Sequence, residues 1–241
     1  MDTPVTERTA PTDPAPTATD PATPTDPAPP IADRATWPTL ESPEALTALI
    51  GEPSQLVKDK VRPALVPEDV DWLAATPFCV LSTSDADGNL DASPKGDPAG
   101  ELVHVIDPQT IALAERPGNQ RADGYRNILQ NPHVGLLCMI PGRGDTLRIN
   151  GRATLVTDAP FFDDMQVKSK RPLLAVVIDI DEVFHHCSKA FLRSQLWKPE
   201  TWAPEAHVPR RAVLANRLDK PDQSVEELDE YCGKSYEEKL Y

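Results

Sequence analysis

The sequence predicts a mainly β fold of the α+β class, an antiparallel barrel with short flanking helices. Apolar runs of strand length follow one another along the chain and are separated by turn residues such as Asp-Gly and Asp-Pro. Only one helical pattern interrupts this series of runs. Parallel strands need a crossover, usually a helix, between neighbours, so successive hairpins with one intervening helix indicate an antiparallel barrel.

The N-terminal part of the chain differs in composition from the rest. Of the 27 prolines in the 241 residues, nine fall within the first 30, mostly in Thr-Asp-Pro and Ala-Pro units without any aromatic residue. Such a segment cannot bury enough apolar surface to offset its ordering entropy, so we predict a disordered tail over residues 1–40. The folded domain is expected over residues 41–205, followed by a C-terminal extension over 206–241.

Charge and hydropathy exclude several classes of partner. The net charge is −14, of which the first 30 residues carry −4, so the remainder is still acidic. Nucleic acids are bound through basic surfaces, and we therefore expect no nucleic-acid partner. The chain contains no apolar run of about 20 residues, the length that spans a bilayer, so no membrane partner is expected either.

The cysteine and histidine patterns argue against structural metal sites. The four cysteines lack Cys-x-x-Cys spacing, which favours neither a zinc site nor a disulfide framework and suits a reducing, cytoplasmic location. His185 and His186 are adjacent, so on a strand they point to opposite faces and cannot easily bind one ion. We predict no metal site.

Two short helices are expected before the barrel. Ser42 is a typical N-cap for the first helix, and Gly51 follows its end. The second helix spans residues 67–75 and leads directly into the first strand. Its expected apolar face is formed by Val70, Leu73 and Ala74.

Seven strands are expected along the domain. The first is joined to the second by an Asp-Gly turn at residues 85–89. The last alternates only in its second half, as a strand does when it is buried first on both faces and later on one. It is also the longest expected strand. The predicted strands cover residues 77–83, 90–93, 102–106, 110–114, 133–140, 146–156 and 173–184.

An Arg-rich turn at residues 116–121 precedes the one helix within the strand series. Arg116, Asn119 and Arg121 offer side-chain donors, and Gly118 lets the backbone approach a ligand closely. Asp123 is the expected cap of the helix, which runs to about residue 130. A turn of this kind at a helix N-terminus suits an anion, and a cofactor phosphate is the expected one. The alternative is a solvated turn with surface arginines.

Three separated motifs carry a family resemblance: Ser-Pro-Lys-Gly at 93–96, the Arg-rich turn with the helix that ends in Arg-Asn-Ile-x-x-Asn-Pro, and His-Cys-Ser-Lys-Ala-Phe-Leu-Arg-Ser-Gln-Leu-Trp at 186–197. Over residues 67–202 the chain resembles the pyridoxamine 5'-phosphate oxidase-like flavoproteins, specifically the branch with an Arg-Pro-Gly-Asn turn. The resemblance implies an antiparallel split β-barrel of the FMN-binding type with short flanking helices. It also implies a homodimer with FMN in the groove between subunits.

The resemblance adds cofactor-binding candidates to those of the Arg-rich turn. These are Ser93, Lys95 and Gly96 of the first motif and Lys189, Arg193 and Trp197 of the last. Lys189 and Arg193 are four residues apart and share one face of a helix, which either closes over a flavin or covers the barrel as an amphipathic helix. Trp197 lies one turn further if the helix continues.

The resemblance implies an FMN-binding flavoprotein, an oxidoreductase that acts on a small organic substrate not identified by the sequence. No general acid or base is recognisable, so catalytic residues remain unassigned. Two alternatives stay open: a non-catalytic protein that binds flavin or haem, and a reductase that uses a deazaflavin.

Overall fold

The structure is a computed structural model that describes residues 34–118, 120–202, 208–233 and 240. The chain divides into two compact units, Met1–Glu52 and Pro53–Tyr241. Most of the predicted disordered tail, residues 1–33, lies outside the described residues. The first unit contains η1 (Arg34–Thr36) and α1 (Pro43–Ile50). Ser42 caps α1 as expected, because its Oγ accepts a hydrogen bond from the Ala45 amide at 3.1 Å.

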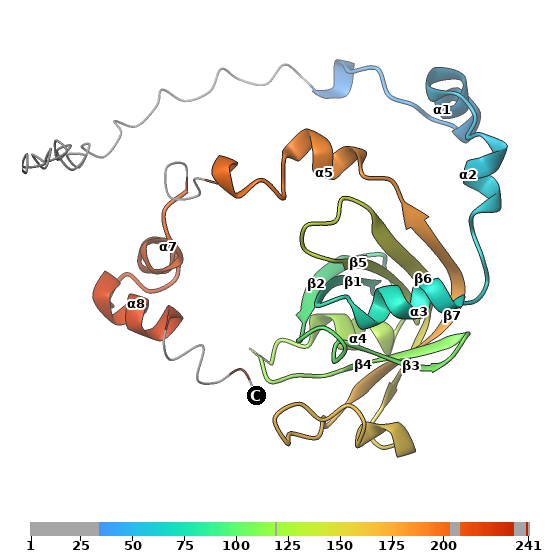
Figure 1. Cartoon of the computed structure of the whole chain (residues 1–241). Coiled ribbons are helices and arrows are strands. Elements are labelled where there is room, and N and C mark those ends of the chain that lie inside the picture. The colour runs from blue at the N-terminus through green and yellow to red at the C-terminus, as the bar shows by residue number, and fades with distance from the viewer. Residues whose placement is uncertain (1–33, 119, 203–207, 234–239, 241) are drawn as a thin grey trace, which may run out of the picture. The chain divides into compact units, whose positions relative to one another are not determined.

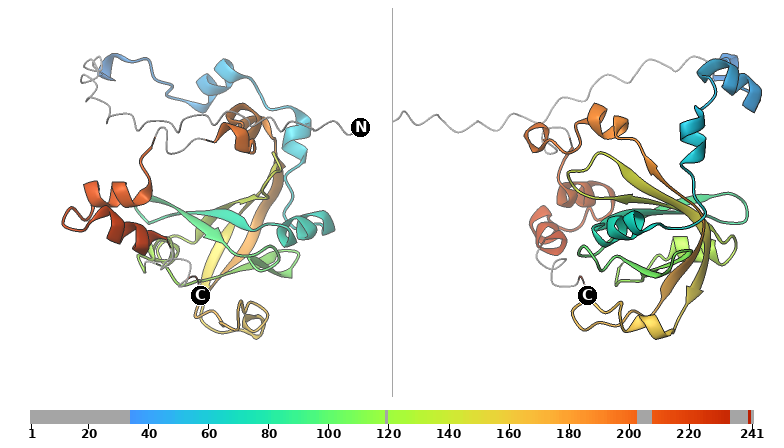
Figure 2. Two further views of the ribbon diagram at one scale, coloured as in Figure 1. Left: turned by 60° about the vertical axis from the view of Figure 1, so that its left-hand side comes forward. Right: turned by 45° about the vertical axis from the view of Figure 1, so that its right-hand side comes forward.

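The second unit is built on one antiparallel sheet of seven strands in the order β2-β1-β5-β6-β7-β4-β3. Every neighbouring pair is antiparallel, and the sheet curves into a split barrel with β2 and β3 at its two edges (Figures 1 and 2). The expected series of strands and the fold class are confirmed. The strands are β1 (Phe78–Ser84), β2 (Leu90–Gly96), β3 (Val103–Asp107), β4 (Thr110–Ala114), β5 (His133–Met139), β6 (Thr146–Val156) and β7 (Ala175–His186).

The core lies on one face of the sheet. In β1 and β5 the burial of side chains alternates strictly, so that Leu81 and Leu136 point inward while Val80 and Leu137 remain half-exposed. This alternation is the two-residue period of a strand with one face on a core. The fully buried side chains at the centre are Leu73, Leu81, Ile111, Leu113, Leu147, Ile149, Ile178 and Val183.

Helix α3 (Pro67–Ala74) supplies Trp72 and Leu73 to this core, but its buried face differs from the expected one. Val70 and Ala74 are exposed, whereas Asp69 is fully buried. The carboxylate of Asp69 accepts hydrogen bonds from Arg62 Nη2 at 2.7 and 2.6 Å and from the Val66 amide at 2.9 Å. This ion pair compensates the burial of the carboxylate. The face of α3 that packs against the sheet therefore includes Asp69, which the spacing of apolar residues alone does not predict.

Helix α4 (Asp123–Ile128) packs against β1 and β2. The expected cap is wrong: Ala122 occupies the N-cap position in the left-handed conformation, with φ of 55°, and no side chain caps the helix. The Asp123 carboxylate lies in the first turn and instead accepts from Arg121 Nε at 2.7 Å. The two charged side chains therefore neutralise each other at the start of the helix.

The remaining helices are short. Helix α5 (Lys189–Ser194) ends at Gln195, whose φ of 51° breaks the helix, so Trp197 does not lie on it. Helices α7 (Arg211–Leu218) and α8 (Val225–Cys232) pack together through Ala212, Ala215 and Leu228. None of the helices in the described part is long and apolar enough to cross a membrane. The other short elements are α2 (Gln55–Asp59), η2 (Pro160–Phe162) and η3 (Pro199–Thr201).

Candidate functional site

A cavity of about 520 Å³ lies between β2 and the segment that joins β4 to α4. It brings together two motifs that are about 20 residues apart in the sequence, Ser-Pro-Lys-Gly on β2 and the Arg-rich turn. The described candidates of both motifs line it: Ser93, Lys95, Gly96, Arg116, Gly118 and Arg121. Asn119 lies outside the described residues. The cavity therefore unites the binding residues that were proposed separately from sequence.

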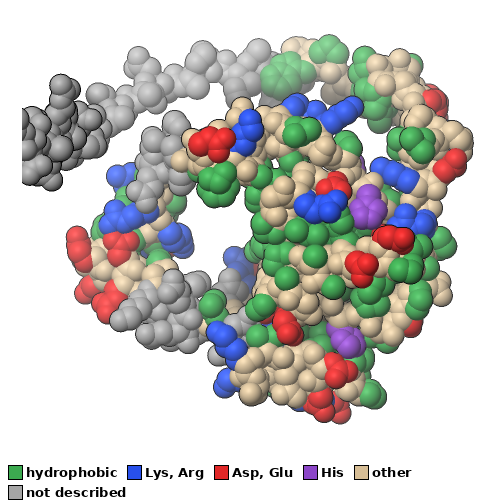
Figure 3. All heavy atoms as spheres, viewed as in Figure 1, with side chains coloured by type: hydrophobic (Ala, Val, Ile, Leu, Met, Phe, Trp, Pro, Cys, Tyr) green, Lys and Arg blue, Asp and Glu red, His purple; other side chains and the backbone are tan. Residues whose placement is uncertain are grey.

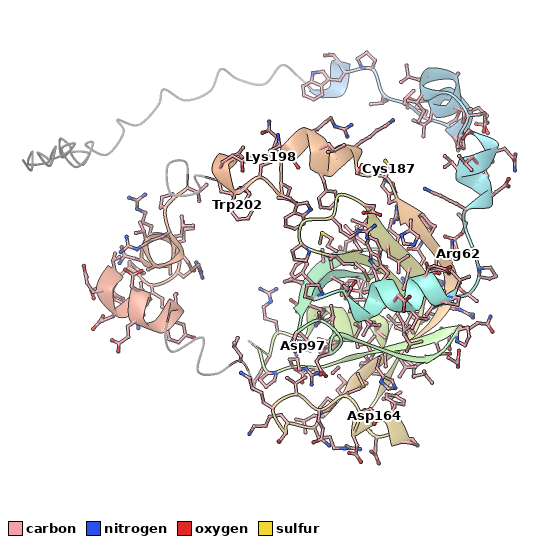
Figure 4. All side chains as sticks on the ribbon, viewed as in Figure 1. Arg62, Asp97, Asp164, Cys187, Lys198 and Trp202 are labelled. Carbon is pink, nitrogen blue, oxygen red and sulfur yellow. The ribbon has the colours of Figure 1, made fainter. Side chains whose placement is uncertain are left out.

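The arrangement of strands explains this meeting. β2 is an edge strand that pairs only with β1, and Pro94 is tolerated there because an edge strand has one side without ladder hydrogen bonds. β4 lies near the other edge, between β7 and β3. The curvature of the sheet places the end of β4 beside β2, and Figure 4 shows Asp97, the residue after β2, on this side of the barrel.

Arg116 fastens the Arg-rich turn to the end of β2. Its Nε donates to Asp97 Oδ2 at 2.7 Å, and Nη1 and Nη2 both donate to the Met165 carbonyl at 3.1 Å. The side chains of Arg116 and Asp97 are 14% and 2% exposed. A buried, bidentately placed guanidinium of this kind holds a loop in one geometry. Arg116 thus lines the cavity while three of its nitrogens donate to protein acceptors.

Arg121 is in a different position. It is 75% exposed and its Nε pairs with Asp123, which is 38% exposed. A surface pair of this kind contributes little to stability, because solvent screens it and both side chains lose entropy. The guanidinium can therefore exchange Asp123 for another anion at small cost.

Lys95 and Tyr125 meet across the cavity. Lys95 Nζ donates to the Tyr125 hydroxyl at 3.1 Å and lies 4.7 Å from the centre of the ring. Since the ammonium group only donates, the phenol oxygen accepts, and the phenol hydrogen remains available to a ligand. Tyr125 was missed by sequence reasoning. Its position in the first turn of the helix that follows the Arg-rich turn is not a signal that singles it out in the sequence.

Four carboxylates, Asp91, Asp97, Glu115 and Asp123, line the cavity together with three cations, Lys95, Arg116 and Arg121. Asp97 and Asp123 pair with Arg116 and Arg121. The pKa of Glu115 is raised by burial, although the positive charges of Lys95 and Arg116 partly oppose this shift. Burial without a paired cation favours the neutral acid. The cavity is therefore polar and nearly balanced in charge rather than strongly basic.

Two glycines of the cavity are not required by the backbone. Neither Gly96 nor Gly118 has a positive φ. A Cβ atom at Gly96 would meet nothing closer than the Pro77 carbonyl oxygen at 3.5 Å, and at Gly118 nothing closer than the Arg116 carbonyl oxygen at 3.9 Å. Because the fold accepts a larger residue at both positions, the missing side chains leave room for a ligand.

The third predicted group lies elsewhere. None of Lys189, Arg193 and Trp197 lines the cavity. The Trp197 indole donates to the Arg143 carbonyl at 2.6 Å and stacks on Phe191 with ring centres 5.9 Å apart, which ties the segment after β7 to the β5–β6 hairpin. Figure 4 shows Cys187, at the start of this segment, and Lys198 and Trp202 further along it. A cofactor contact from this segment stays a prediction.

Comparison with known proteins places the chain in a family. The model of the pyridoxamine 5'-phosphate oxidase family, in its N-terminal domain form, matches residues 65–187, about half of the chain. The chain belongs to this family. The matched range runs from just before α3 to the end of β7 and contains both motifs of the cavity. No curated protein is similar enough in sequence to match.

Several solved structures are similar to this protein. One is Group A Streptococcus HupZ, with 19% identity over 50% of this chain and 93% of that one, at a TM-score of 0.41. Another is a Lactobacillus delbrueckii protein provisionally assigned as a pyridoxamine 5'-phosphate oxidase, with 26% identity, 51% and 95% coverage and a TM-score of 0.40. A third is an F420 reductase, with 19% identity, 50% and 98% coverage and a TM-score of 0.36.

Proposed function

We propose that the protein binds FMN in the cavity between β2 and the Arg-rich turn and is an FMN-dependent oxidoreductase for a small organic substrate. The observation that carries this proposal is the convergence of Ser93–Gly96 and the Arg-rich turn on one cavity in a member of this family. A cofactor that carries phosphate fits the donors and the open glycine positions. Bound flavin would supply the electron-transfer chemistry, and the protein would supply binding and orientation.

The residues of the cavity divide into distinct roles in this proposal. Arg121 would hold the phosphate by exchanging its surface contact with Asp123, and Gly118 would let the backbone approach it. Arg116 would keep the turn in place through Asp97. Lys95 would place positive charge beside the ligand, which favours an anionic reduced form, and Tyr125 would offer its hydroxyl hydrogen.

We further propose that a second copy of the chain completes the site. The outer face of β1 and β5 carries Phe78, Val80, Leu137 and Met139, which stay half-exposed or exposed, with Phe78 at 38%. A contiguous apolar sheet face of this kind is covered in most soluble proteins, and a twofold copy is the commonest cover. Light scattering should give a dimer that FMN stabilises. A monomer that binds FMN with full affinity contradicts the dimer and leaves the flavin proposal standing.

The absorption spectrum of the purified, FMN-treated protein tests the choice of cofactor. Flavin gives two visible bands that dithionite bleaches. A Soret band would favour a haem-binding protein instead, and the single band of a deazaflavin would favour a deazaflavin-dependent reductase. A colourless protein after FMN addition and gel filtration contradicts the proposal.

A further inference from the structure

A second group of cationic side chains lies on the outer face of β6 and β7, around Phe184. Arg148 is directly opposite Phe184 in the β6–β7 ladder, and its Cζ lies 5.1 Å from the ring centre. Lys60 Nζ lies 5.3 Å from the same ring. His186 follows two residues after Phe184 and so projects from the same face of β7. We call Lys60, Arg148 and His186 the Phe184 cluster.

The cluster is held in place by the backbone. Arg62 and Val183 exchange two hydrogen bonds, from the Arg62 amide to the Val183 carbonyl at 3.0 Å and in the opposite direction at 2.8 Å. This isolated bridge fixes the chain just after Lys60 against β7. Figure 3 shows that Lys, Arg, Asp and Glu side chains are interspersed on the face in view. The sheet therefore positions Arg148 and His186, and the bridge at Arg62 holds the adjoining chain that carries Lys60.

The cluster has no acidic partner among the described residues. Arg143 in the turn between β5 and β6 and Arg152 on β6 each pair with a carboxylate, Asp145 at 2.8 Å and Asp181 at 3.2 Å. No such ion pair forms at Lys60 or Arg148 in the described part of the chain. Glu182, two residues before Phe184 on the same face of β7, accepts a hydrogen bond from Asn150 Nδ2 at 3.0 Å.

The titration of His186 reflects these surroundings. Its pKa is lowered, first by burial and then by the positive charges of Lys60 and Arg148. Like charges held close together repel, and in a chain with a net charge of −14 such an uncompensated group is unusual. An anion bound between these side chains would remove the repulsion and allow His186 to bind a proton.

We propose that the Phe184 cluster binds the phosphate group of a small anionic ligand. Arg148 offers planar hydrogen-bond donors and Lys60 offers a single positive charge. His186 can bind a proton when the ligand binds, which adds a further positive charge. Together these groups suit an anion that carries two negative charges. None of the three residues lines the cavity between β2 and the Arg-rich turn. The proposal goes beyond FMN binding and does not depend on it.

Proton NMR of His186 with inorganic phosphate tests the proposal on the full-length protein. The C2 proton of His186 is assigned by its loss in His186→Asn, and its pH titration is measured in phosphate and in sodium chloride of equal ionic strength. The chloride sample is needed because salt screening alone raises the pKa. We expect the His186 midpoint to be higher in phosphate than in chloride. A rise of one pH unit means that phosphate binds about tenfold more tightly when His186 is protonated than when it is neutral.

Matched variants separate this site from the cavity. In Arg148→Gln the midpoint in chloride should rise, since one cation is lost, and the further rise in phosphate should disappear. Lys60→Gln, at the chain segment before the sheet, should weaken the phosphate response without disturbing the β6–β7 ladder. Arg121→Ala should keep the full response. FMN affinity should be the same in Arg148→Gln and the wild type.

Three results would overturn the proposal. The first is an equal His186 midpoint in phosphate and chloride for the wild type. The second is an unchanged phosphate response in both Arg148→Gln and Lys60→Gln. The third is a His186 midpoint in chloride that lies above the usual histidine value and falls when the protein is diluted. That result would mean that an acidic group of a second copy occupies the cluster.

Discussion

Replacing Asp97 by Ala should destabilise the protein strongly, because Asp97 belongs to a buried ion pair at the cavity wall. The carboxylate is 2% exposed and accepts from Arg116, which is itself 14% exposed. Removal of one partner of a buried ion pair costs about 3 to 5 kcal/mol, because the other charge stays buried without compensation. Arg116 keeps its two bonds to the Met165 carbonyl, so we expect the lower end, about 3 kcal/mol.

Asp123→Ala is the matched control for this change. Asp123 also pairs with an arginine of the Arg-rich turn at 2.7 Å, but Arg121 is 75% exposed and Asp123 is 38% exposed, so solvent screens this pair. Exposed pairs contribute about 1 kcal/mol or less. Urea denaturation followed by circular dichroism gives both free energies of unfolding. Equal losses for the two variants would refute the argument that Arg116 and Asp97 form the structural anchor of the turn.

Three further predictions concern the tail, a glycine and a half-buried acid. Deletion of residues 1–30 should leave the melting temperature and FMN affinity nearly unchanged, as measured by differential scanning fluorimetry, because that segment lacks apolar groups; a large loss of either contradicts it. Gly118→Ala should keep the melting temperature, since a Cβ there meets nothing within 3.9 Å, yet weaken FMN binding in a fluorescence titration; a parallel loss of both points to a backbone role instead. Glu115→Gln should stabilise the protein at neutral pH, because burial raises the pKa of Glu115 in the folded protein. Ionisation of Glu115 therefore opposes folding as the pH rises above the pKa of the unfolded chain. The advantage of the variant should vanish in urea melts at acidic pH. A gain that persists at acidic pH rules out this cause.

Local signals predicted the elements of the fold better than they predicted contacts between them. The strands and their order along the chain follow from alternation and turn residues, and β6 covers the expected residues 146–156. The apolar face of α3 was wrong because Asp69 is buried through an ion pair with Arg62. No local pattern in the sequence indicates that pairing.

The candidate site shows the same limit. The two motifs were predicted from residue types and from the family resemblance, and the structure brings them to one cavity. The anchoring role of Arg116 depends on Asp97, 19 residues away, and on the Met165 carbonyl, 49 residues away. Asp123 was expected as a helix cap, but the left-handed Ala122 shifts the start of α4 and directs Asp123 to Arg121. Such contacts depend on how distant segments pack.

The central claim is that the Arg-rich turn binds the phosphate of FMN, and titration of FMN and riboflavin against the wild type and Arg121→Ala tests it most directly. Riboflavin lacks the phosphate, so only FMN should respond to the loss of the guanidinium. We expect FMN to bind about tenfold more weakly to the variant, which corresponds to about 1.4 kcal/mol for one charge-assisted contact at an exposed side chain. Riboflavin affinity should be unchanged. Equal losses for both ligands, or no loss for FMN, would contradict the assignment of this turn to the phosphate.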